Sequence, residues 1–181
     1  EEDIKPGFNE HLKILKEAGV DLIILEAMTS KDRTVENIIE CSKNVKLPIW
    51  LSISCAINED ENILMHGYQE SITNSKAKFY DTLENSLSKF SKVHEGPILV
   101  AHSDIKVTGE AVKILKKVHK GIVGAYPNNG YFEKPHWKLI NDISPSKYLE
   151  EAKNWVSNGA QIIGGCCGVG PDKISAISIL K

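Results

Sequence analysis

Short apolar runs alternate along the chain with segments in which apolar residues recur every three or four positions. The short runs have the length of strands, and runs this apolar are typical of strands buried on both faces, as in parallel sheets. The segments between them have the period of amphipathic helices. Five strands are predicted, at residues 20–26, 48–54, 97–103, 121–128 and 160–165.

Helices are predicted on both sides of these strands, each from residues that share one helix face. The expected faces are Phe8, Leu12, Leu15 and Ala18; Val35, Ile38 and Ile39; Phe79, Leu83, Leu87 and Phe90; Val112, Leu115 and Val118; Tyr148, Ala152, Trp155 and Val156; and Ile174 with Ile177. Gly19 follows the first segment as a stop signal, and Ser144 before Pro145 has the pattern of a helix N-cap. Residues 55–75 and the stretch through Trp137 have no clear period and are predicted to be loops.

The alternation of five strands with helices predicts a single-domain α/β fold with a parallel sheet. Two architectures agree with this pattern: a doubly wound open sheet, and part of a (β/α)8 barrel of the TIM type. Open sheets often carry a glycine-rich phosphate loop after the first strand. The corresponding segment here, AMTSKD at residues 27–32, has no glycine, which disfavours a nucleotide site but leaves other open sheets as an alternative.

Composition and charge exclude several classes of function. Among 181 residues, 41% are hydrophobic and 25% charged, with a formal net charge of −2. No global field therefore attracts nucleic acid or an anionic membrane, and no apolar run is long enough to span a bilayer. Four cysteines are too few for a secreted disulfide framework, so we expect reduced thiols and a cytoplasmic protein. The chain begins at Glu1 without a methionine, so we expect that its N-terminus has been trimmed or lost.

Polar residues gather where the predicted strands end, which is the edge where ligands bind in both architectures. They are Glu26, Ser54, Cys55, His102, Ser103, Asp104, Tyr126, Asn128, Cys166 and Cys167. Two adjacent cysteines with a histidine suit a soft cation, zinc above all. Three protein ligands would leave a fourth position open, as in catalytic zinc sites.

Each candidate also has a structural interpretation. The cysteine pair could simply pack after a buried strand, and His102 could form a strand-end hydrogen bond. Glu26 could cap a neighbouring helix or pair with a lysine, and Tyr126 to Asn129 could simply form a turn. Cys41, on a predicted helix, is expected to be inert packing, whereas the role of Cys55 stays open because it lies on the same edge as the cysteine pair.

Four segments resemble the homocysteine S-methyltransferases, a family that includes betaine- and S-methylmethionine-dependent enzymes and the homocysteine module of cobalamin-dependent methionine synthase. The segments are EAGVDLIILEAMTS, KLPIWLSISC, GAYPNNGYF followed by Trp137, and NWVSNGAQIIGGCCGVGPDKISAI. The last contains the family's closing signature, Gly-Gly-Cys-Cys-Gly-x-x-Pro before a final helix, and is the most specific. The similarity extends over nearly all 181 residues.

The resemblance implies a (β/α)8 TIM-type barrel with zinc at the C-terminal ends of its strands. Residues 1–181 would form a single homocysteine-binding domain that supplies about the last five βα units and lacks the first three strands. Cys166 and Cys167 would bind zinc, and Glu26 would hold the amino group of homocysteine. Tyr126 and Asn128 are predicted to contact the substrate as well.

One segment departs from the family pattern. The family's third zinc ligand is a cysteine in a Val-Asn-Cys segment, but the aligned residues here read VAHSD. His102 therefore stands where that cysteine belongs. Because histidine also binds zinc, we predict His102 as the third metal ligand. Loss of the metal is the other possibility, and Cys55 is a displaced alternative ligand.

The predicted activity is the transfer of a methyl group to the thiol of homocysteine, which forms methionine at a zinc site. The expected partners are this small thiol and a methyl donor, and neither nucleic acid nor membrane. One alternative is a non-catalytic or degenerate relative that binds a small thiol or amino acid without turnover. Another is redox chemistry through a reversible disulfide between Cys166 and Cys167. The sequence leaves the methyl donor and the oligomeric state open.

Overall fold

A computed structural model describes residues 4–29, 32–66, 77–133, 136–138 and 143–180. The helices are α1 (Lys5–Glu17), α2 (Asp32–Ser42), the short 3-10 helix η1 (Lys43–Val45), α4 (Leu83–Val93), α5 (Ile105–Val118), α6 (Pro145–Ser157) and α7 (Pro171–Ile177). The main strands are β1 (Ile23–Leu25), β2 (Ile49–Ile53), β5 (Ile98–Asp104), β6 (Val123–Asn128) and β9 (Ile162–Ile163). Two hairpins add β3 (Cys55–Ile57) with β4 (Ile63–Met65), and β7 (Tyr131–Glu133) with β8 (His136–Lys138).

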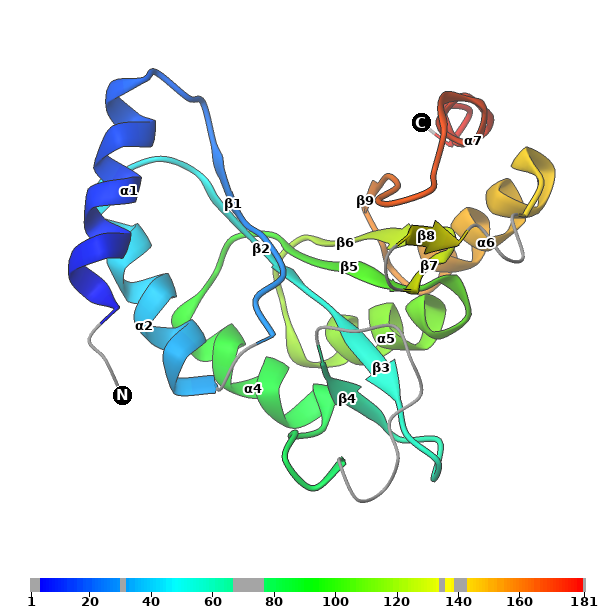
Figure 1. Cartoon of the computed structure of the whole chain (residues 1–181), viewed down its shortest axis with the longest axis horizontal. Helices are drawn as coiled ribbons and strands as arrows, with labels where there is room; N and C mark the ends of the chain where they lie inside the picture. Colours follow the sequence, from blue (N-terminus) through cyan, green and yellow to red (C-terminus); the bar gives the residue numbers. More distant parts are fainter. Residues whose placement is uncertain (1–3, 30–31, 67–76, 134–135, 139–142, 181) are drawn as a thin grey trace.

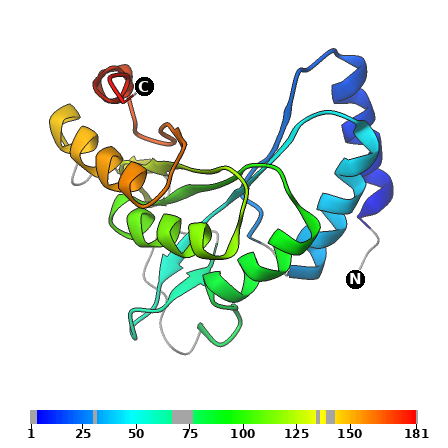
Figure 2. The ribbon, with the colours of Figure 1, turned by 180° about the vertical axis from the view of Figure 1, so that it is seen from behind.

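The five main strands form one parallel sheet in the order β1-β2-β5-β6-β9. Each strand therefore pairs with the next main strand along the chain. The helices contact one another in the same succession, α1 with α2, α2 with α4, α4 with α5, and α5 with α6. Figures 1 and 2 show these helices following the outer side of a curved sheet. This is the arrangement of a TIM-type barrel segment, whereas a doubly wound sheet has helices on both faces.

The core lies between the sheet and its helices. Register-matched strand residues such as Leu51, Ile98 and Val123 are fully buried and pack with the helices. Along each strand, the residues that alternate with these buried ones point to the opposite, concave face of the sheet. Ile24 of β1 is on this face and is 42% exposed. On that face a side chain at Gly124 would lie 2.7 Å from the Ile162 carbonyl oxygen, so glycine allows β9 to approach β6 closely.

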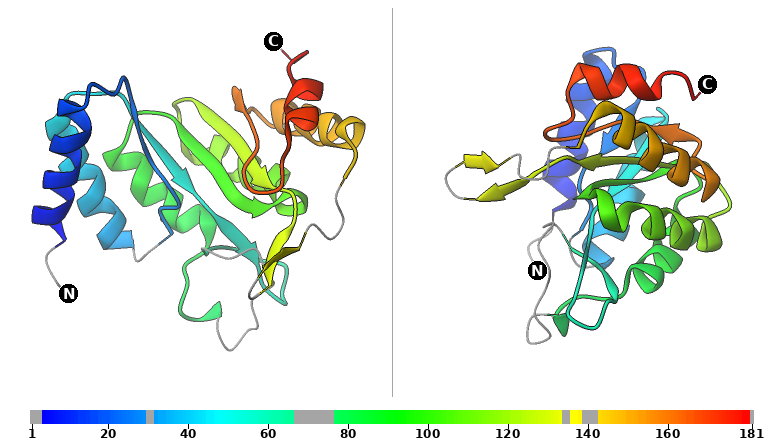
Figure 3. Two further views of the ribbon diagram at one scale, coloured as in Figure 1. Left: turned by 45° about the horizontal axis from the view of Figure 1, so that its top comes forward. Right: turned by 90° about the vertical axis from the view of Figure 1, so that its right-hand side faces the viewer.

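Both predicted loops contain short hairpins, which corrects the sequence-based prediction. Within residues 55–75, β3 and β4 pair antiparallel, while residues 67–76 lie outside the described residues. The Asn58 side chain closes their turn by accepting hydrogen bonds from the Asp60 and Asn62 backbone amides. The polar turn separates two strands of three residues each, too short to show a period. Trp137 lies in β8, and Figure 3 shows the β7–β8 hairpin extending away from the sheet.

Four residues on the predicted helix faces differ from the prediction. Ala18 follows α1 as its C-cap and is exposed. Phe79 lies in a turn before α4 and is 75% exposed. The helix begins only at Leu83, because Thr82 is its N-cap and accepts a hydrogen bond from the Asn85 amide. Val156 and Ile174 lie on their predicted helices but are more than 40% exposed. The predicted N-cap is confirmed, since the Ser144 hydroxyl accepts from the Lys147 amide and Pro145 begins α6. No helix among the described residues has both the length and the apolar character that crossing a bilayer requires.

Candidate metal centre and substrate site

Three side chains with soft or borderline donor atoms meet at the C-terminal ends of β5 and β9. His102 lies in β5, and Cys166 and Cys167 follow β9. One donor atom from each of the three lies within 4.8 Å of the others. The two sulfur atoms are 3.8 Å apart. All three side chains are half-buried, so the group opens to solvent at the edge of the sheet where barrel sites form.

Backbone hydrogen bonds to β6 and to the residue after it position the cysteine pair. The Cys166 amide donates to the Pro127 carbonyl over 2.9 Å, and the Asn129 amide donates to the Cys167 carbonyl over 2.7 Å. The chain then turns, with the Val169 amide bonded to the Cys166 carbonyl. Gly168 has a φ of 76° at the third position of this turn, a conformation that favours glycine. The sequence Cys-Cys-Gly thus lets the chain turn immediately after the two thiols.

A local irregularity in β5 positions His102. Its φ is 48°, in the left-handed region that costs a non-glycine residue about 1 kcal/mol. The register between β5 and β6 shifts between Ala101 and Asp104, on either side of this residue. The Ser103 hydroxyl donates to the Ala101 carbonyl over 2.8 Å and accepts from the Cys55 amide over 2.9 Å. These bonds hold the bulge, and bulges of this kind redirect side chains next to functional sites.

Asn128, at the end of β6, links the histidine to the cysteines. Its side chain is buried, with 2% of the residue exposed. The side-chain oxygen accepts a hydrogen bond from the Cys167 amide over 3.1 Å. The side-chain nitrogen lies 3.2 Å from Nδ1 of His102. Asn128 therefore links two of the three residues, His102, Cys166 and Cys167, that form the candidate metal-binding group.

Glu26, directly after β1, forms a second polar cluster. The Tyr126 hydroxyl donates to one carboxylate oxygen over 2.8 Å, and the Ser52 hydroxyl donates to the other over 3.3 Å. Burial raises the pKa of Tyr126, and the adjacent Glu26 carboxylate raises it further, so the phenol remains a proton donor. The negative charge of Glu26 also contributes to raising the pKa of Cys166, so this cluster lies within electrostatic reach of the cysteine pair.

The Cys166 thiol is protonated at neutral pH when no cation is bound. Burial raises its pKa to about 11, and the neighbouring Cys167 and Glu26 add to the increase. A hydrogen bond with the Cys167 backbone offsets only part of this effect. Binding of a metal ion must therefore displace a proton from this sulfur, which makes metal affinity depend on pH.

Comparison with known proteins identifies the family. The family model described as homocysteine S-methyltransferase matches residues 1–180. The chain belongs to the homocysteine S-methyltransferase family. Homocysteine S-methyltransferase 3 of Zea mays is 29% identical over 188 residues, which cover 97% of this chain and 49% of the relative. Selenocysteine methyltransferase of Astragalus bisulcatus is 23% identical over 186 residues, again covering 97% and 49%.

The fold of this family member also resembles that of a solved structure. The homocysteine methyltransferase MmuM from Escherichia coli, in its metallated form, superposes with a TM-score of 0.66 at 17% identity. The match covers 98% of this chain and 52% of that chain. The predicted TIM-type barrel arrangement is confirmed. The chain spans about half the length of the curated relatives it matches.

Several residues considered in the sequence of this family member lie apart from the candidate metal-binding group. The Cys55 sulfur is fully buried 3.5 Å from the Ser103 hydroxyl oxygen, and Cys55 is not a member of the group found among the described residues. Burial raises its pKa to about 12, although the hydrogen bond with Ser103 counteracts this in part. Asp104 instead caps α5 through the Lys106 amide. Cys41 is buried in α2, as expected for packing.

Sequence reasoning missed the roles of two serines. Ser52 contacts Glu26 from the concave face of β2, and Ser103 holds the bulge at His102. A polar residue inside the otherwise apolar run PIWLSIS is a signal that could have identified Ser52. No comparable signal reveals the contact of Ser103, because it depends on the bulge itself.

Proposed function

We propose that this family member transfers a methyl group to the thiol of homocysteine at a zinc ion held by His102, Cys166 and Cys167. The proposal rests on the convergence of these three side chains, with donor atoms within 4.8 Å, at the edge where barrel active sites form. The names of the curated relatives, homocysteine and selenocysteine methyltransferases, support an amino acid with a thiol or selenol as the methyl acceptor.

The donor set and its spacing suit zinc. Two thiolates bound to a tetrahedral zinc ion at about 2.3 Å lie about 3.8 Å apart. The sulfur atoms of Cys166 and Cys167 are 3.8 Å apart, and a movement of about 1 Å would bring the His102 nitrogen to bonding distance. Thiolate and imidazole are ligands typical of zinc rather than of calcium or magnesium.

The chain's own residues would bind and orient the substrate. Zinc at this position would supply the positive charge that lowers the pKa of a coordinated thiol. The Glu26 carboxylate would accept hydrogen bonds from the ammonium group of homocysteine, while Tyr126 and Ser52 keep the carboxylate in place. Asn128 would hold the segment that carries His102 next to the segment that carries Cys166 and Cys167. These contacts would align the sulfur with the methyl group of a sulfonium, an ammonium or a methylated cofactor.

Residues 1–181 would form one homocysteine-binding barrel domain, supplying its last five βα units, and the first three strands would come from outside this segment. The free cysteines agree with a reducing compartment such as the cytoplasm. A small thiol and a methyl donor would be its partners.

Zinc content tests the metal site. The purified chain is expected to contain about one zinc ion, measured by inductively coupled plasma mass spectrometry. Cys166→Ser should lose the metal because a neutral hydroxyl replaces a thiolate ligand. Cys55→Ala is the matched control and should keep it, since Cys55 contacts Ser103 instead. Equal zinc content in Cys166→Ser and wild type would contradict the assignment.

Methyl transfer tests the activity. Zinc-loaded protein is incubated with homocysteine and either a sulfonium donor, S-methylmethionine, or an ammonium donor, betaine, and methionine is measured by mass spectrometry. Methionine formation that depends on Cys166 supports the proposal. Tight homocysteine binding with no methionine from either donor or from a methylated cobalamin would instead favour the alternative, a relative that binds a small thiol without turnover.

A further inference from the structure

Hydrogen-bond chemistry fixes the orientation of the Asn128 side chain. The Cys167 backbone amide can only donate, so the group that faces it over 3.1 Å must be the Asn128 oxygen. The other end of the same side chain, an NH2 group that can only donate, then faces Nδ1 of His102 over 3.2 Å. Since Asn128 is only 2% exposed, solvent does not compete for these contacts.

This orientation determines which nitrogen of His102 carries the proton. Nδ1 must accept the hydrogen bond from Asn128, and a neutral imidazole with an accepting Nδ1 carries its proton on Nε2. In this state Nδ1 already bonds to Asn128, and Nε2 has no lone pair to offer a cation. Histidine ligands of metals usually have the opposite arrangement, in which the second nitrogen donates to a carboxylate or a carbonyl.

We propose that Asn128 holds His102 in the Nε2–H tautomer and thereby weakens it as the third metal ligand. This inference rests on the proposed zinc site. Binding through Nδ1 has to displace the Asn128 amide. Binding through Nε2 requires the proton to move to Nδ1, where it would face the NH2 group of Asn128. A hydrogen bond of a buried side chain is lost in either case, so Asn128 is a positioning residue that lowers zinc affinity.

The substitution Asn128→Asp reverses this effect with almost no change in size. A carboxylate accepts hydrogen bonds from both the Cys167 amide and Nδ1–H of His102, which frees Nε2 for the metal. We expect zinc affinity to rise about 10-fold or more, in the range seen for such supporting contacts. Asn129→Asp is the control for charge, because it adds the same charge on the next residue but places a carboxylate oxygen against the Gly168 carbonyl, to which Asn129 donates, and not against His102.

Two measurements test the inference. Nitrogen-15 NMR of histidine-labelled, metal-free protein at pH about 8 reports the tautomer, with the His102 signal assigned by its loss in His102→Gln. Wild type should show Nε2–H, and Asn128→Asp should show Nδ1–H. Competition with a chromogenic chelator gives the zinc affinity of each variant.

The possible outcomes separate this inference from the proposed function. Nδ1–H in wild type, or equal zinc affinity in Asn128→Asp and Asn129→Asp, would overturn the inference while leaving the zinc site intact. Zinc binding by Asn128→Asp but not by wild type would support it in its strongest form. Absence of zinc binding in both proteins, with the fold intact by circular dichroism, would overturn the zinc site itself and with it the proposed function.

Discussion

The Tyr126 hydroxyl donates a hydrogen bond to the Glu26 carboxylate over 2.8 Å, although the two residues lie 100 positions apart in the sequence. Glu26 follows β1 and Tyr126 belongs to β6, and β2 and β5 lie between these two strands in the sheet. Three strand spacings amount to about 14 Å along a sheet. The contact forms because the sheet curves and brings both side chains to its concave face. This curvature is what distinguishes a barrel segment from a flat open sheet.

Tyr126→Phe should weaken homocysteine binding without loss of zinc. The substitution removes a hydrogen bond to a carboxylate, worth about 1.5 kcal/mol, so the KM for homocysteine should rise roughly 10-fold. Zinc content should stay the same, because Tyr126 is not among the three residues of the metal-binding group. The control is Tyr80→Phe, whose ring packs against His66. Unchanged homocysteine binding would show that Glu26 does not need Tyr126 for its orientation.

His102→Cys should accelerate methyl transfer. A thiolate ligand in place of a neutral imidazole makes the zinc site more negative by one charge, so a sulfur bound there becomes a better nucleophile. The substitution also removes the partner of the Asn128 side-chain nitrogen. We expect an increase of at least several-fold in the single-turnover rate of zinc-loaded protein, measured by methionine formation. A variant that retains zinc but shows no gain would count against the charge argument.

The five strands could be predicted because buried parallel strands consist of apolar runs that need no knowledge of tertiary contacts. The hairpins could not, since β3 and β4 have three residues each and the pairing of Cys55 with Met65 is visible only in space. The start of α4 was misplaced because Phe79 matches the helical spacing from Leu83, whereas the cap at Thr82 decides where the helix begins.

The sequence also predicts some features of the candidate site and not others. Strand ends predicted which residues share one edge, and His102, Cys166 and Cys167 do meet there. The left-handed backbone of His102 could not be predicted, because only a few per cent of non-glycine residues adopt it and histidine, although enriched among them, is far more often found elsewhere. The contact of Asn128 with His102 depends in turn on the register shift between β5 and β6. Side-chain orientation inside the site therefore required the structure.

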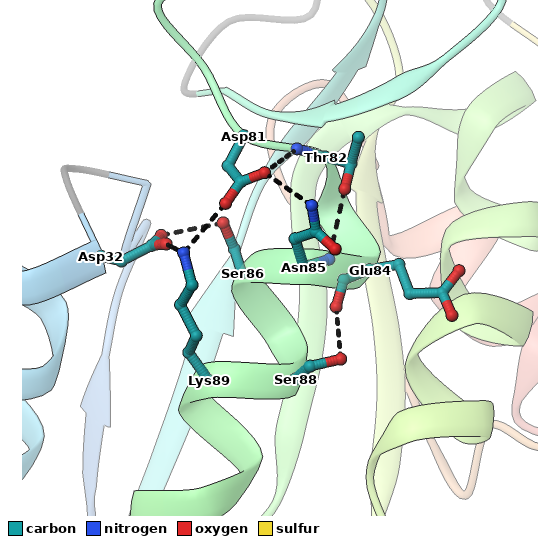
Figure 4. Close-up of polar contacts among 8 residues, drawn as sticks. All are labelled: Asp32, Asp81, Thr82, Glu84, Asn85, Ser86, Ser88 and Lys89. Atoms are coloured by element: carbon teal, nitrogen blue, oxygen red, sulfur yellow. Dashed lines mark hydrogen bonds and ion pairs between the residues drawn. The ribbon is translucent and has the colours of Figure 1, made fainter.

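Lys89→Met should destabilise the packing of α2 against α4. Figure 4 shows the Lys89 ammonium between two carboxylates, with the Ser86 hydroxyl bonded to Asp32 as well. The ammonium nitrogen lies 2.5 Å from an Asp32 oxygen and 2.9 Å from an Asp81 oxygen. Without the lysine, two carboxylates would face each other. We expect a loss of about 1 kcal/mol in the free energy of unfolding, larger at low salt.

Urea denaturation measures this loss, with Lys113→Met as the control. Lys113 forms an exposed pair with Glu110 on one helix, so its loss should be about 0.3 kcal/mol or less. Burial opposes ionisation of Asp81, but hydrogen bonds from Asn85, Lys89 and the Thr82 amide outweigh it and lower the pKa of Asp81. The contribution of the Asp81 carboxylate to the free energy of unfolding is therefore present above pH about 4. It is lost as the pH falls through the lower pKa that Asp81 has in the folded state. Equal losses in both variants would contradict a special role for Lys89.

Mild acid should destabilise the chain through a pair of buried histidines at equivalent places in successive βα units. His94 ends α4 and His119 ends α5, and each backbone amide donates to the last turn of its helix. Their Nε2 atoms lie 3.3 Å from the Pro97 carbonyl and 3.0 Å from the Gly96 carbonyl. Carbonyls only accept, so both Nε2 atoms carry a proton.

Burial lowers the pKa of both His94 and His119, and the hydrogen bonds to carbonyls offset this only in part. The folded chain then takes up these protons at lower pH than the unfolded chain, whose histidines titrate near 6.5. Stability should be constant above pH about 7 and fall as the pH drops below about 6.5, until the lower pKa of the folded state is reached. The midpoint of thermal unfolding, measured between pH 7.5 and 5.5, should decrease in wild type. In the double variant His94→Gln, His119→Gln this midpoint should depend less on pH. The control His11→Gln, at an exposed position, should keep the pH dependence of wild type. A full pH dependence in the double variant would assign the effect to other groups.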